Sequence, residues 1–244
     1  MREGFKALEI VSNNEISTNI FEIKLLMEHE KEIKPGQFFM IRGWEATDPF
    51  LPRPLSVADV EKNELTFLYE VRGKGTHIIS KLRKKDTLEV LGPLGNGFTL
   101  EKNKKIALIS GGIGIAPMFY LLKNLNATID FYAGFRSDVY WMDKIKTQVD
   151  NLYVSTEDGS CGNKGFCIDQ FDPEKYDLVL TCGPVPMMKK VLGMCKGIVP
   201  VQVSMESRMA CGIGACLGCT VETPGGMKRV CKEGPVFKGK EVLF

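Results

Sequence analysis

The sequence predicts an antiparallel β-barrel, followed by a doubly wound parallel α/β domain and a small cysteine-rich module at the C-terminus. Three observations predict this order. Short β-rich runs separated by turns fill residues 1–101, strands alternate with helical stretches over residues 102–205, and four of the eight cysteines crowd into residues 206–244. We take these three ranges as the expected domains, because the pattern of residues changes between them.

The first range is typical of a small barrel. Residues 21–25 alternate apolar and polar side chains, as a half-buried strand does, and residues 37–41, 65–69 and 87–91 are further β-rich runs. Turn signals containing Pro, Gly and Asn divide them. One short helix is expected over residues 77–82. Many short strands without long helices between them favour an antiparallel barrel.

The second range changes to alternating strands and helices. Residues 106–109 form a continuous apolar strand, a glycine turn follows, and residues 116–125 are helical in pattern. The later strand candidates and one helix candidate continue this alternation; they are residues 129–133, 152–155, 178–181 and 199–203, and the helix 185–195. Such βα units predict a doubly wound parallel sheet.

Composition excludes several classes of protein. The 32 Lys and Arg residues balance 30 Asp and Glu residues, which leaves a formal charge of only +2. Nucleic-acid and polybasic membrane binders need clustered positive charge, so neither partner is expected. No apolar run approaches the ~20 residues that span a bilayer, and the N-terminus lacks an apolar signal core. We therefore expect a cytoplasmic protein whose cysteines serve metal or redox chemistry rather than disulfides.

The strongest motif is the spacing of Cys211, Cys216 and Cys219, a C-x4-C-x2-C pattern with Cys231 as a fourth thiol. This is the plant-type [2Fe–2S] ligand pattern. Four thiolates leave the oxidised cluster with a net charge of −2, so backbone N–H groups must point at the sulfurs. Small residues between the cysteines allow the chain that close approach. The motif predicts an iron–sulfur cluster.

Two other interpretations of these cysteines stay open. A structural zinc site is one, although zinc sites usually pair cysteines as two C-x2–4-C units and Cys231 has no near partner. A redox dithiol formed by Cys216 and Cys219 is the other, but it leaves Cys211 and Cys231 without a role.

Two short motifs in the barrel range suit a flavin dinucleotide. Arg53-Pro54-Leu55-Ser56 stands just before a predicted strand, and Gly75 and Thr76 open the short helix. A pyrophosphate needs a cation, hydroxyl donors and backbone N–H groups, which these residues offer. Tyr69 is placed to line the adenine or ribose side.

A glycine-rich turn in the second range suits a nicotinamide dinucleotide. Gly111, Gly112 and Gly114 follow an apolar strand and open a helix, with Pro117 where the usual fingerprint has its third glycine. Proline in the first turn of a helix is compatible with that geometry. Cys182-Gly183-Pro184 follows another strand at the carboxyl edge, where open α/β sheets bind ligands.

In this order the motifs resemble the ferredoxin–NAD(P) reductase superfamily. With residues 92–98 and the terminal cysteines, the chain looks like the electron-transfer subunits of type B dihydroorotate dehydrogenases over nearly its whole length. That family implies FAD in the barrel, NAD(H) on the α/β domain and [2Fe–2S] in the terminal loop. It also implies a partner, a separate FMN-containing catalytic subunit that oxidises dihydroorotate to orotate in pyrimidine biosynthesis, with two copies of each subunit in a heterotetramer.

The resemblance also assigns site residues by matching motif. The flavin site comprises Arg53, Pro54, Leu55, Ser56, Leu68, Tyr69, Glu70, Val71, Gly75 and Thr76. The nicotinamide site comprises Gly111, Gly112, Gly114, Pro117, Cys182, Gly183 and Pro184, and the cluster ligands are Cys211, Cys216, Cys219 and Cys231. Leu55 replaces the tyrosine common in the broader superfamily, and aliphatic residues are usual in the narrower family.

Residues 155–159 favour NAD(H) over NADP(H). Reductases that prefer NADPH typically carry Ser-Arg after the third strand of this domain, whereas Glu157 stands here and would accept from a ribose hydroxyl and repel a phosphate. Arg136 is a cation that argues the other way.

The expected mechanism is an electron relay from the partner through the cluster and FAD to NAD⁺, with no catalytic acid or base in this chain. Two alternatives remain. One is a related reductase subunit of a bifurcating transhydrogenase or a sulfide dehydrogenase, relatives that often replace one cluster cysteine by aspartate. The other is a zinc-stabilised binding module without redox activity.

Overall fold

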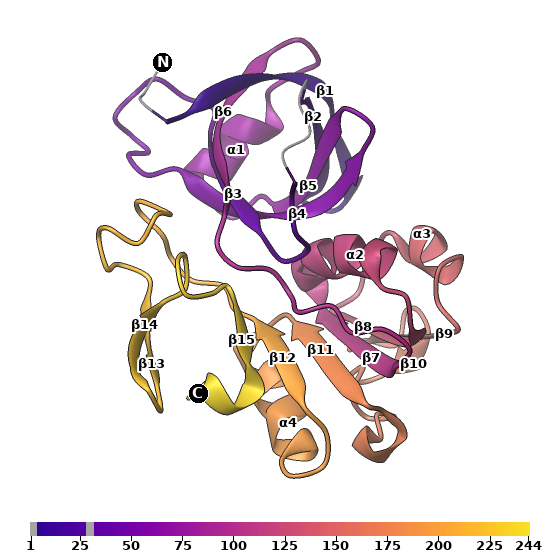
Figure 1. The fold of residues 1–244 in the computed structure, drawn as a ribbon. Helices are drawn as coiled ribbons and strands as arrows, with labels where there is room; N and C mark the ends of the chain where they lie inside the picture. Colours follow the sequence, from indigo (N-terminus) through magenta and orange to yellow (C-terminus); the bar gives the residue numbers. More distant parts are fainter. Residues whose placement is uncertain (1–3, 28–31) are drawn as a thin grey trace.

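The computed structural model describes residues 4–27 and 32–244. Its first part is a closed barrel of six strands in the order β1-β2-β5-β4-β3-β6, every pair of which is antiparallel (Figure 1). The strands are β1 (Lys6–Ser17), β2 (Ile20–Leu26), β3 (Phe38–Arg42), β4 (Arg53–Glu61), β5 (Glu64–Glu70) and β6 (Thr87–Leu94). The predicted barrel is confirmed.

The barrel interior is filled by alternate residues of its strands. Ile23, Val57, Phe67 and Val90 belong to one buried cluster, as the two-residue period of strands requires. Helix α1 (Lys74–Ser80) follows β5 and contributes the fully buried Ile79 to the same cluster. The barrel is thus a rigid frame on which the loops at its ends are carried.

The second part is a seven-stranded sheet in the order β10-β9-β8-β7-β11-β12-β15. Its parallel strands are β7 (Lys105–Gly111), β8 (Thr128–Phe135), β9 (Asn151–Thr156), β10 (Asn163–Lys164), β11 (Leu178–Cys182) and β12 (Val201–Ser204). The chain order reverses between β7 and β11, and this switch point is where open α/β sheets bind ligands. The doubly wound domain is also confirmed.

Helices cover both faces of this sheet. The short helix η1 (Gly112–Gly114), α2 (Ile115–Asn124) and α3 (Met142–Lys146) lie on one side, and α4 (Val185–Cys195) lies on the other. Successive residues of each strand alternate between the two buried clusters that result. Leu108 and Leu180 face α2, whereas Ile109 and Val179 face α4. A further short helix, η2 (Pro173–Lys175), precedes β11. Within the described residues, no helix has both the length and the apolar character needed to cross a bilayer.

The C-terminal part is a hairpin of β13 (Thr220–Thr223) and β14 (Gly226–Arg229), followed by β15 (Val236–Lys238) and the short helix η3 (Gly239–Glu241). β15 pairs antiparallel with β12 and so extends the parallel sheet (Figure 1). Asn96, from the segment joining barrel and sheet, donates its amide to the carbonyl oxygens of Lys232 and Glu233 at 3.0 and 3.2 Å. The cysteine-bearing segment is therefore attached to both larger parts.

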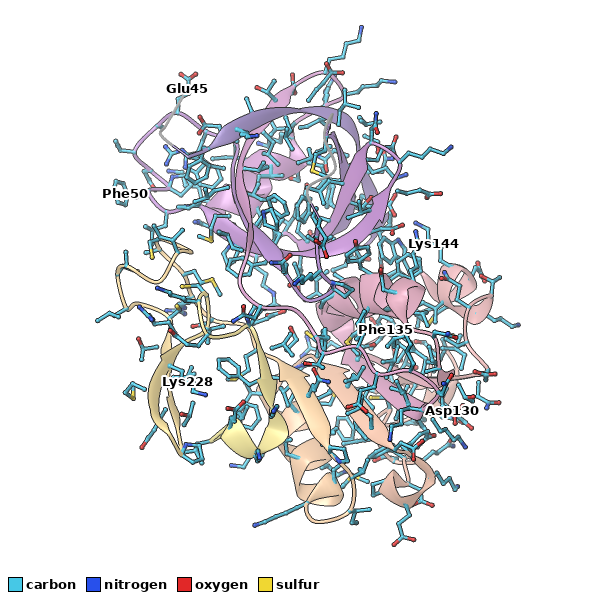
Figure 2. The ribbon with its side chains drawn as sticks, viewed as in Figure 1. Glu45, Phe50, Asp130, Phe135, Lys144 and Lys228 are labelled. Atoms are coloured by element: carbon cyan, nitrogen blue, oxygen red, sulfur yellow. The ribbon has the colours of Figure 1, made fainter. Side chains whose placement is uncertain are left out.

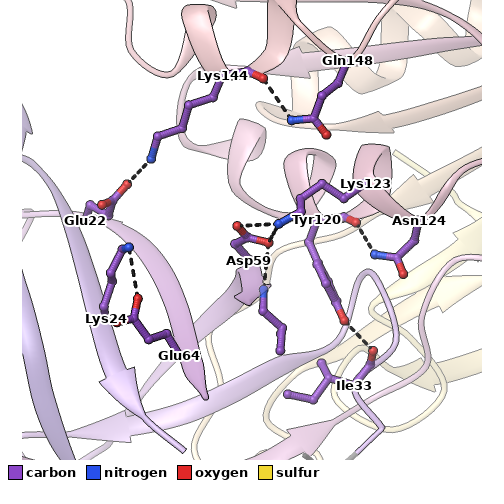
Figure 3. Close-up of polar contacts among 11 residues, drawn as sticks. Glu22, Lys24, Ile33, Asp59, Glu64, Tyr120, Lys123, Asn124, Lys144 and Gln148 are labelled. Carbon is purple, nitrogen blue, oxygen red and sulfur yellow. Dashed lines mark hydrogen bonds and ion pairs between the residues drawn. The ribbon is translucent and has the colours of Figure 1, made fainter. Parts of the chain in front are cut away.

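Polar contacts join the barrel to α2 and α3 (Figure 3). Lys123 donates to both carboxylate oxygens of Asp59 at 2.7 and 2.9 Å, and the Tyr120 hydroxyl donates to the Ile33 carbonyl at 3.0 Å in a buried position. Lys144 forms an ion pair of 2.7 Å with Glu22. These contacts hold the barrel at a defined position over α2.

One local expectation needs correction. The Arg53-Pro54-Leu55-Ser56 motif is expected from the sequence to precede a strand, but these residues are the first four of β4, and Pro54 pairs with Met40 of β3. Proline is tolerated at the beginning of a strand, where a ladder hydrogen bond can be spared. The motif is therefore held by the barrel wall rather than by a flexible loop.

Candidate functional site

A cleft opens where the three parts of the chain meet. The barrel lines it with Pro54, Leu55 and Ser56 of β4 and with residues 68–70 of β5. Residue 113 of η1 and residues 116 and 117 at the start of α2 form a second wall, and residues 205–207 and 209 form a third. This third segment leads directly to Cys211. The cleft thus brings the predicted flavin motif, the glycine-rich turn and the approach to the cysteines together.

Arg53 lies at the edge of the cleft against α1. A Cβ placed on Gly75 would come within 2.9 Å of the Arg53 guanidinium, so a larger residue there would require the guanidinium to shift. The guanidinium also donates to the carbonyl of Leu51 and lies 5.4 Å from the centre of the Trp44 ring. Arg53 and Gly75 therefore form a cationic cradle of the kind that a pyrophosphate requires, and the chain fits FAD there.

Thr76 and Val71 are already engaged by the backbone. The Thr76 hydroxyl accepts from the backbone N–H groups of Arg72 and Gly73 at 3.1 and 3.3 Å, which caps α1. The Val71 N–H donates to the Asn19 carbonyl at 2.8 Å. Glu70 forms an ion pair of 2.6 Å with Arg72. These residues shape the cleft by fixing the turn between β5 and α1.

Tyr69 belongs to the lining of the cleft, and its contact with an adenine or ribose stays a prediction. Its side chain is 1% exposed, its hydroxyl donates to Asn13 at 2.9 Å, and its ring stacks on Phe21. Burial raises the pKa of the Tyr69 hydroxyl well above its usual range, against the smaller opposing effect of Asn13. Because successive strand residues face opposite sides, Tyr69 points into the barrel.

The glycine-rich turn meets the loop after β11 at the switch point. A Cβ on Gly114 would lie 2.4 Å from the Cys182 carbonyl oxygen, and one on Gly183 would lie 2.8 Å from the backbone nitrogen of Gly111. Gly112 has a φ of +52° and open space where a Cβ would point. The two loops therefore lie in backbone contact beside an open glycine, as the approach of a dinucleotide pyrophosphate demands.

Cys182 lies at the carboxyl end of β11, between Ser110 of β7 and Ser204 of β12 in register. It is 1% exposed, and burial raises the pKa of its thiol well above the usual value. Cys182 is thus a buried, neutral thiol at the strand end that leads into Gly183 and Pro184. Pro184 caps α4 and packs near Gly111, where a Cβ would lie 2.6 Å from the proline ring.

Glu157 stands exposed just after β9, with its N–H donating to the Phe135 carbonyl of β8 at 3.1 Å. Arg136 follows Phe135 at the end of β8. Glu157, which favours NAD(H), and Arg136, which favours NADP(H), therefore lie at the ends of neighbouring strands.

The four terminal cysteines lie in two pairs. The Cys216 N–H donates to the Cys211 sulfur at 3.4 Å, and the Cys231 N–H donates to the Cys219 sulfur at 3.4 Å. Within the described residues, no three His, Cys, Asp or Glu side chains come close enough to hold a single metal ion. Two thiolates for each of two irons fit this pairing.

Backbone amides surround the exposed pair. Burial disfavours the Cys211 thiolate, but the N–H groups of Cys216, Ile213 and Ala215 outweigh it and lower the pKa of Cys211 to about 6. Gly212 has a φ of +71°, and a Cβ on it would lie 2.4 Å from Met40 of the barrel. The loop can therefore offer amides to sulfur and pack against β3 at the same time, which fits an anionic cluster.

The sequence did not identify the residues that form the third wall of the cleft. Met205, Glu206 and Ser207 line it together with Arg72. Desolvation raises the pKa of the Glu206 carboxyl, and the nearby Arg72 guanidinium opposes this rise. Their position immediately after the carboxyl end of β12 was the one available signal, because that edge of the sheet carries the ligand loops.

Comparisons with known proteins agree with this geometry. A crystal structure of a ferredoxin NADP+ reductase from Neisseria gonorrhoeae with bound FAD and NADP aligns with 81% of this chain and 92% of its own, at a TM-score of 0.67 and 16% identity. This likeness defines the fold of the chain as ferredoxin reductase-like. The sequence model for the iron-sulfur cluster binding domain of dihydroorotate dehydrogenase B matches residues 206–243.

Full-length relatives define the family. The dihydroorotate dehydrogenase B (NAD(+)) electron transfer subunit of Clostridium acetobutylicum is 49% identical over 100% of this chain and 99% of its own, and that of Clostridium perfringens is 46% identical over 99% of each. This chain belongs to the family of dihydroorotate dehydrogenase B electron transfer subunits. The structure of an NADH-dependent reduced ferredoxin-NADP oxidoreductase, described as bifurcating electrons, is also similar, with a TM-score of 0.88 and 32% identity over 97% of this chain and 89% of its own.

Proposed function

We propose that this chain is the subunit that carries electrons from the FMN of a separate dihydroorotate dehydrogenase catalytic subunit to NAD⁺, in de novo pyrimidine biosynthesis. The orotate-forming site lies on that partner, and two copies of each subunit form a heterotetramer in the cytoplasm. The observation that carries this proposal is the cleft between β4, α2 and the segment before Cys211, since one space there adjoins all three predicted cofactor sites.

Each of the three ranges of the chain binds one cofactor. Residues 1–101 bind FAD, residues 102–205 bind NAD(H), and residues 206–244 bind the cluster. When bound, the cluster would carry one electron at a time, and FAD would collect two electrons and a proton and deliver them as a hydride. Arg53 and Gly75 hold the flavin pyrophosphate, while Pro54, Leu55, Ser56 and Leu68 line the flavin cleft. The turn before α1 is fixed by Glu70, Val71 and Thr76, and it supports the flavin cleft.

The glycine turn and its neighbours hold NAD(H). Gly111, Gly112 and Gly114 present backbone at the switch point, and Pro117 lines the cleft from the first turn of α2. Gly183 and Pro184 complete the opposite loop, which begins after the buried Cys182 at the end of β11. Glu157 accepts from a ribose hydroxyl at the end of β9 and repels a 2′-phosphate.

The cysteine pairs hold the irons: Cys211 and Cys216 bind one, and Cys219 and Cys231 bind the other. The chain needs no acid or base of its own, because its residues bind, orient and exclude water around the cofactors.

The test is co-expression with a candidate FMN-containing catalytic subunit, followed by an assay of orotate formation with NAD⁺. Cys216→Ser should abolish NAD⁺-dependent turnover and leave dihydroorotate oxidation by artificial acceptors intact. Normal NAD⁺ coupling in that variant would contradict the relay. The zinc-module alternative requires a colourless chain that contains zinc and lacks flavin absorption.

A second candidate is a reductase subunit of an electron-bifurcating complex, because the similarity to the ferredoxin-NADP oxidoreductase covers nearly the whole chain. The partner recovered by co-purification distinguishes the two. An FMN-bearing subunit that oxidises dihydroorotate supports the first candidate, and a large subunit that carries further iron–sulfur clusters supports the second.

A further inference from the structure

The four cysteines lie on two separate stretches of chain. Cys211, Cys216 and Cys219 lie on residues 211–219, and Cys231 lies in the turn after β14. Arg229, the last residue of β14, organises that turn. Its carbonyl oxygen accepts from the N–H groups of Lys232, Glu233 and Gly234 at 3.1, 2.9 and 3.4 Å. Cys231 lies inside the turn that these bonds close, so Arg229 fixes the backbone on both sides of this cysteine.

The Arg229 side chain reaches the other stretch. Its Nη1 donates to the Gly214 carbonyl at 2.8 Å, and Gly214 lies inside the loop between Cys211 and Cys216. Its Nε donates to a Glu233 carboxylate oxygen at 3.0 Å, and its Nη2 donates to the other oxygen. The planar guanidinium offers donors in a fixed fork, so it can hold both partners at once.

Packing strengthens this connection. A Cβ on Gly214 would lie 2.6 Å from the side chain of Lys232, so the loop backbone lies directly against the residue after Cys231. Gly214 has a φ of +83°, which glycine adopts without strain. The carbonyl of Gly214 is thus turned toward Arg229 by a conformation that other residues rarely take.

The guanidinium also acts on the cysteines through its charge. It reaches the Gly214 carbonyl, between Cys211 and Cys216, and Arg229 stands two residues before Cys231, so the charge lies beside both stretches that carry the cysteines. A reduced cluster carries one more negative charge than an oxidised cluster, and a nearby fixed cation stabilises the more negative state. Net charge and hydrogen bonding around the sulfurs are among the factors that set the potentials of such clusters. Glu233 orients the cation and offsets part of its charge.

We propose that Arg229 is a positioning residue of the cluster site, which joins the Cys211–Cys216 loop to the Cys231 turn and raises the reduction potential of the bound cluster. This inference rests on the proposed function in one respect, the presence of a [2Fe–2S] cluster on these cysteines. No role in hydride transfer is assigned to Arg229.

The experiment uses the full chain, purified anaerobically with its cofactors, and four proteins besides wild type. Arg229→Gln removes the charge, Arg229→Lys keeps the charge but loses the fork, and Glu233→Gln removes the opposing charge. The matched control is Lys228→Gln, because Lys228 is the neighbouring cation of β14 (Figure 2) and pairs with Glu241 at 2.9 Å. Iron and sulfide content, the EPR spectrum of the reduced cluster and its midpoint potential are measured for each.

Arg229→Gln is expected to lower the ratio of reduced to oxidised cluster about tenfold at a fixed ambient potential, which is about 59 mV for one electron. Glu233→Gln should move the potential the opposite way. Arg229→Lys should recover most of the potential but change the EPR line shape, and Lys228→Gln should match wild type.

The inference is overturned if Arg229→Gln and Lys228→Gln have the same potential, or if the Arg229→Gln and Glu233→Gln potentials shift in the same direction. Should Arg229→Gln fail to hold iron, Glu233→Gln decides: a higher potential supports the inference and an unchanged or lower one overturns it. A wild-type chain without iron and sulfide would refute the proposed function and this inference together, whereas a normal wild-type cluster with insensitive variants refutes the inference alone.

Discussion

Replacing Gly75 by Ala is expected to weaken FAD binding while the barrel stays folded. The new Cβ would lie 2.9 Å from the Cζ, Nε and Nη2 atoms of Arg53. This distance is shorter than the van der Waals contact distance between a methyl carbon and these atoms. The guanidinium has little freedom to retreat, because it donates to the carbonyls of Leu51 and Pro52 and lies over the Trp44 ring. Arg53 would therefore have to leave its position beside α1.

The magnitude follows from the contact that is lost. A hydrogen bond to a charged group contributes about 1.5–3 kcal/mol, and 1.4 kcal/mol is a tenfold change in affinity. The dissociation constant for FAD should rise about 10- to 150-fold in Gly75→Ala. The assay removes the flavin from each protein and then titrates FAD with the apoprotein, following the quenching of flavin fluorescence.

Gly73→Ala provides the matched control. A Cβ on Gly73 meets no atom within 4 Å, and the backbone there is extended, with a φ of −166°. This variant should bind FAD within about twofold of wild type, which is less than about 0.5 kcal/mol. Equal affinities of the two variants for FAD would refute the reasoning, because Arg53 beside Gly75 would then not hold the cofactor.

Three further outcomes are expected. Tyr120→Phe should lower the free energy of unfolding by about 1–3 kcal/mol in denaturant titrations, because it leaves the buried Ile33 carbonyl without its hydroxyl donor. A change below about 0.5 kcal/mol would show that another donor replaces the hydroxyl. Leu217→Asp should weaken co-purification of the partner and spare reduction of small acceptors by NADH, because Leu217 is 62% exposed beside Cys216. The control Ile198→Asp changes another exposed apolar residue, after α4 (50% exposed), and should leave co-purification unchanged. Equal effects of the two variants would contradict a docking role. In the native protein at pH 8, iodoacetamide should alkylate the exposed Cys161 and spare Cys167 and Cys195, since burial raises the pKa of Cys167 to about 12 and that of Cys195 to about 11. Raising the pH toward 11 should increase labelling of Cys195 before that of Cys167. Peptide mass spectrometry that finds the reverse order would be inconsistent with these pKa values.

Local pattern was a reliable guide where burial alone decides the structure. The helix expected over residues 185–195 is α4 with the same ends, and the apolar run 106–109 lies within β7. Pattern was weaker where a strand carries polar residues. β1 is the longest strand of the barrel, yet its sequence contains Ser12, Asn13 and Asn14. Asn13 is accommodated because its amide bonds to the Tyr69 hydroxyl and to the Ile79 and Leu82 carbonyls, and the pairing of β1 with β6 comes from a distant part of the chain.

The candidate site divides in the same way. The cysteines and the glycine turn were readable because cluster ligation and pyrophosphate binding each require fixed spacings within a few residues. The direction of the Tyr69 side chain was not readable from the sequence, because a one-residue shift along a strand sends the side chain to the opposite face. The cleft wall from Met205 to Met209 carries no motif at all, and only its position after β12 brings it to the other two walls.

By itself, the amino-acid sequence determined the three-part order of the chain, its family and the chemistry of its cofactors, because these depend on short-range spacing and residue type. Only the tertiary structure decided that the cysteines form two pairs, that β15 extends the parallel sheet and that Arg229 reaches from the Cys231 turn to Gly214. Each of these depends on contacts between segments distant in sequence, and such contacts exist only after the chain has packed.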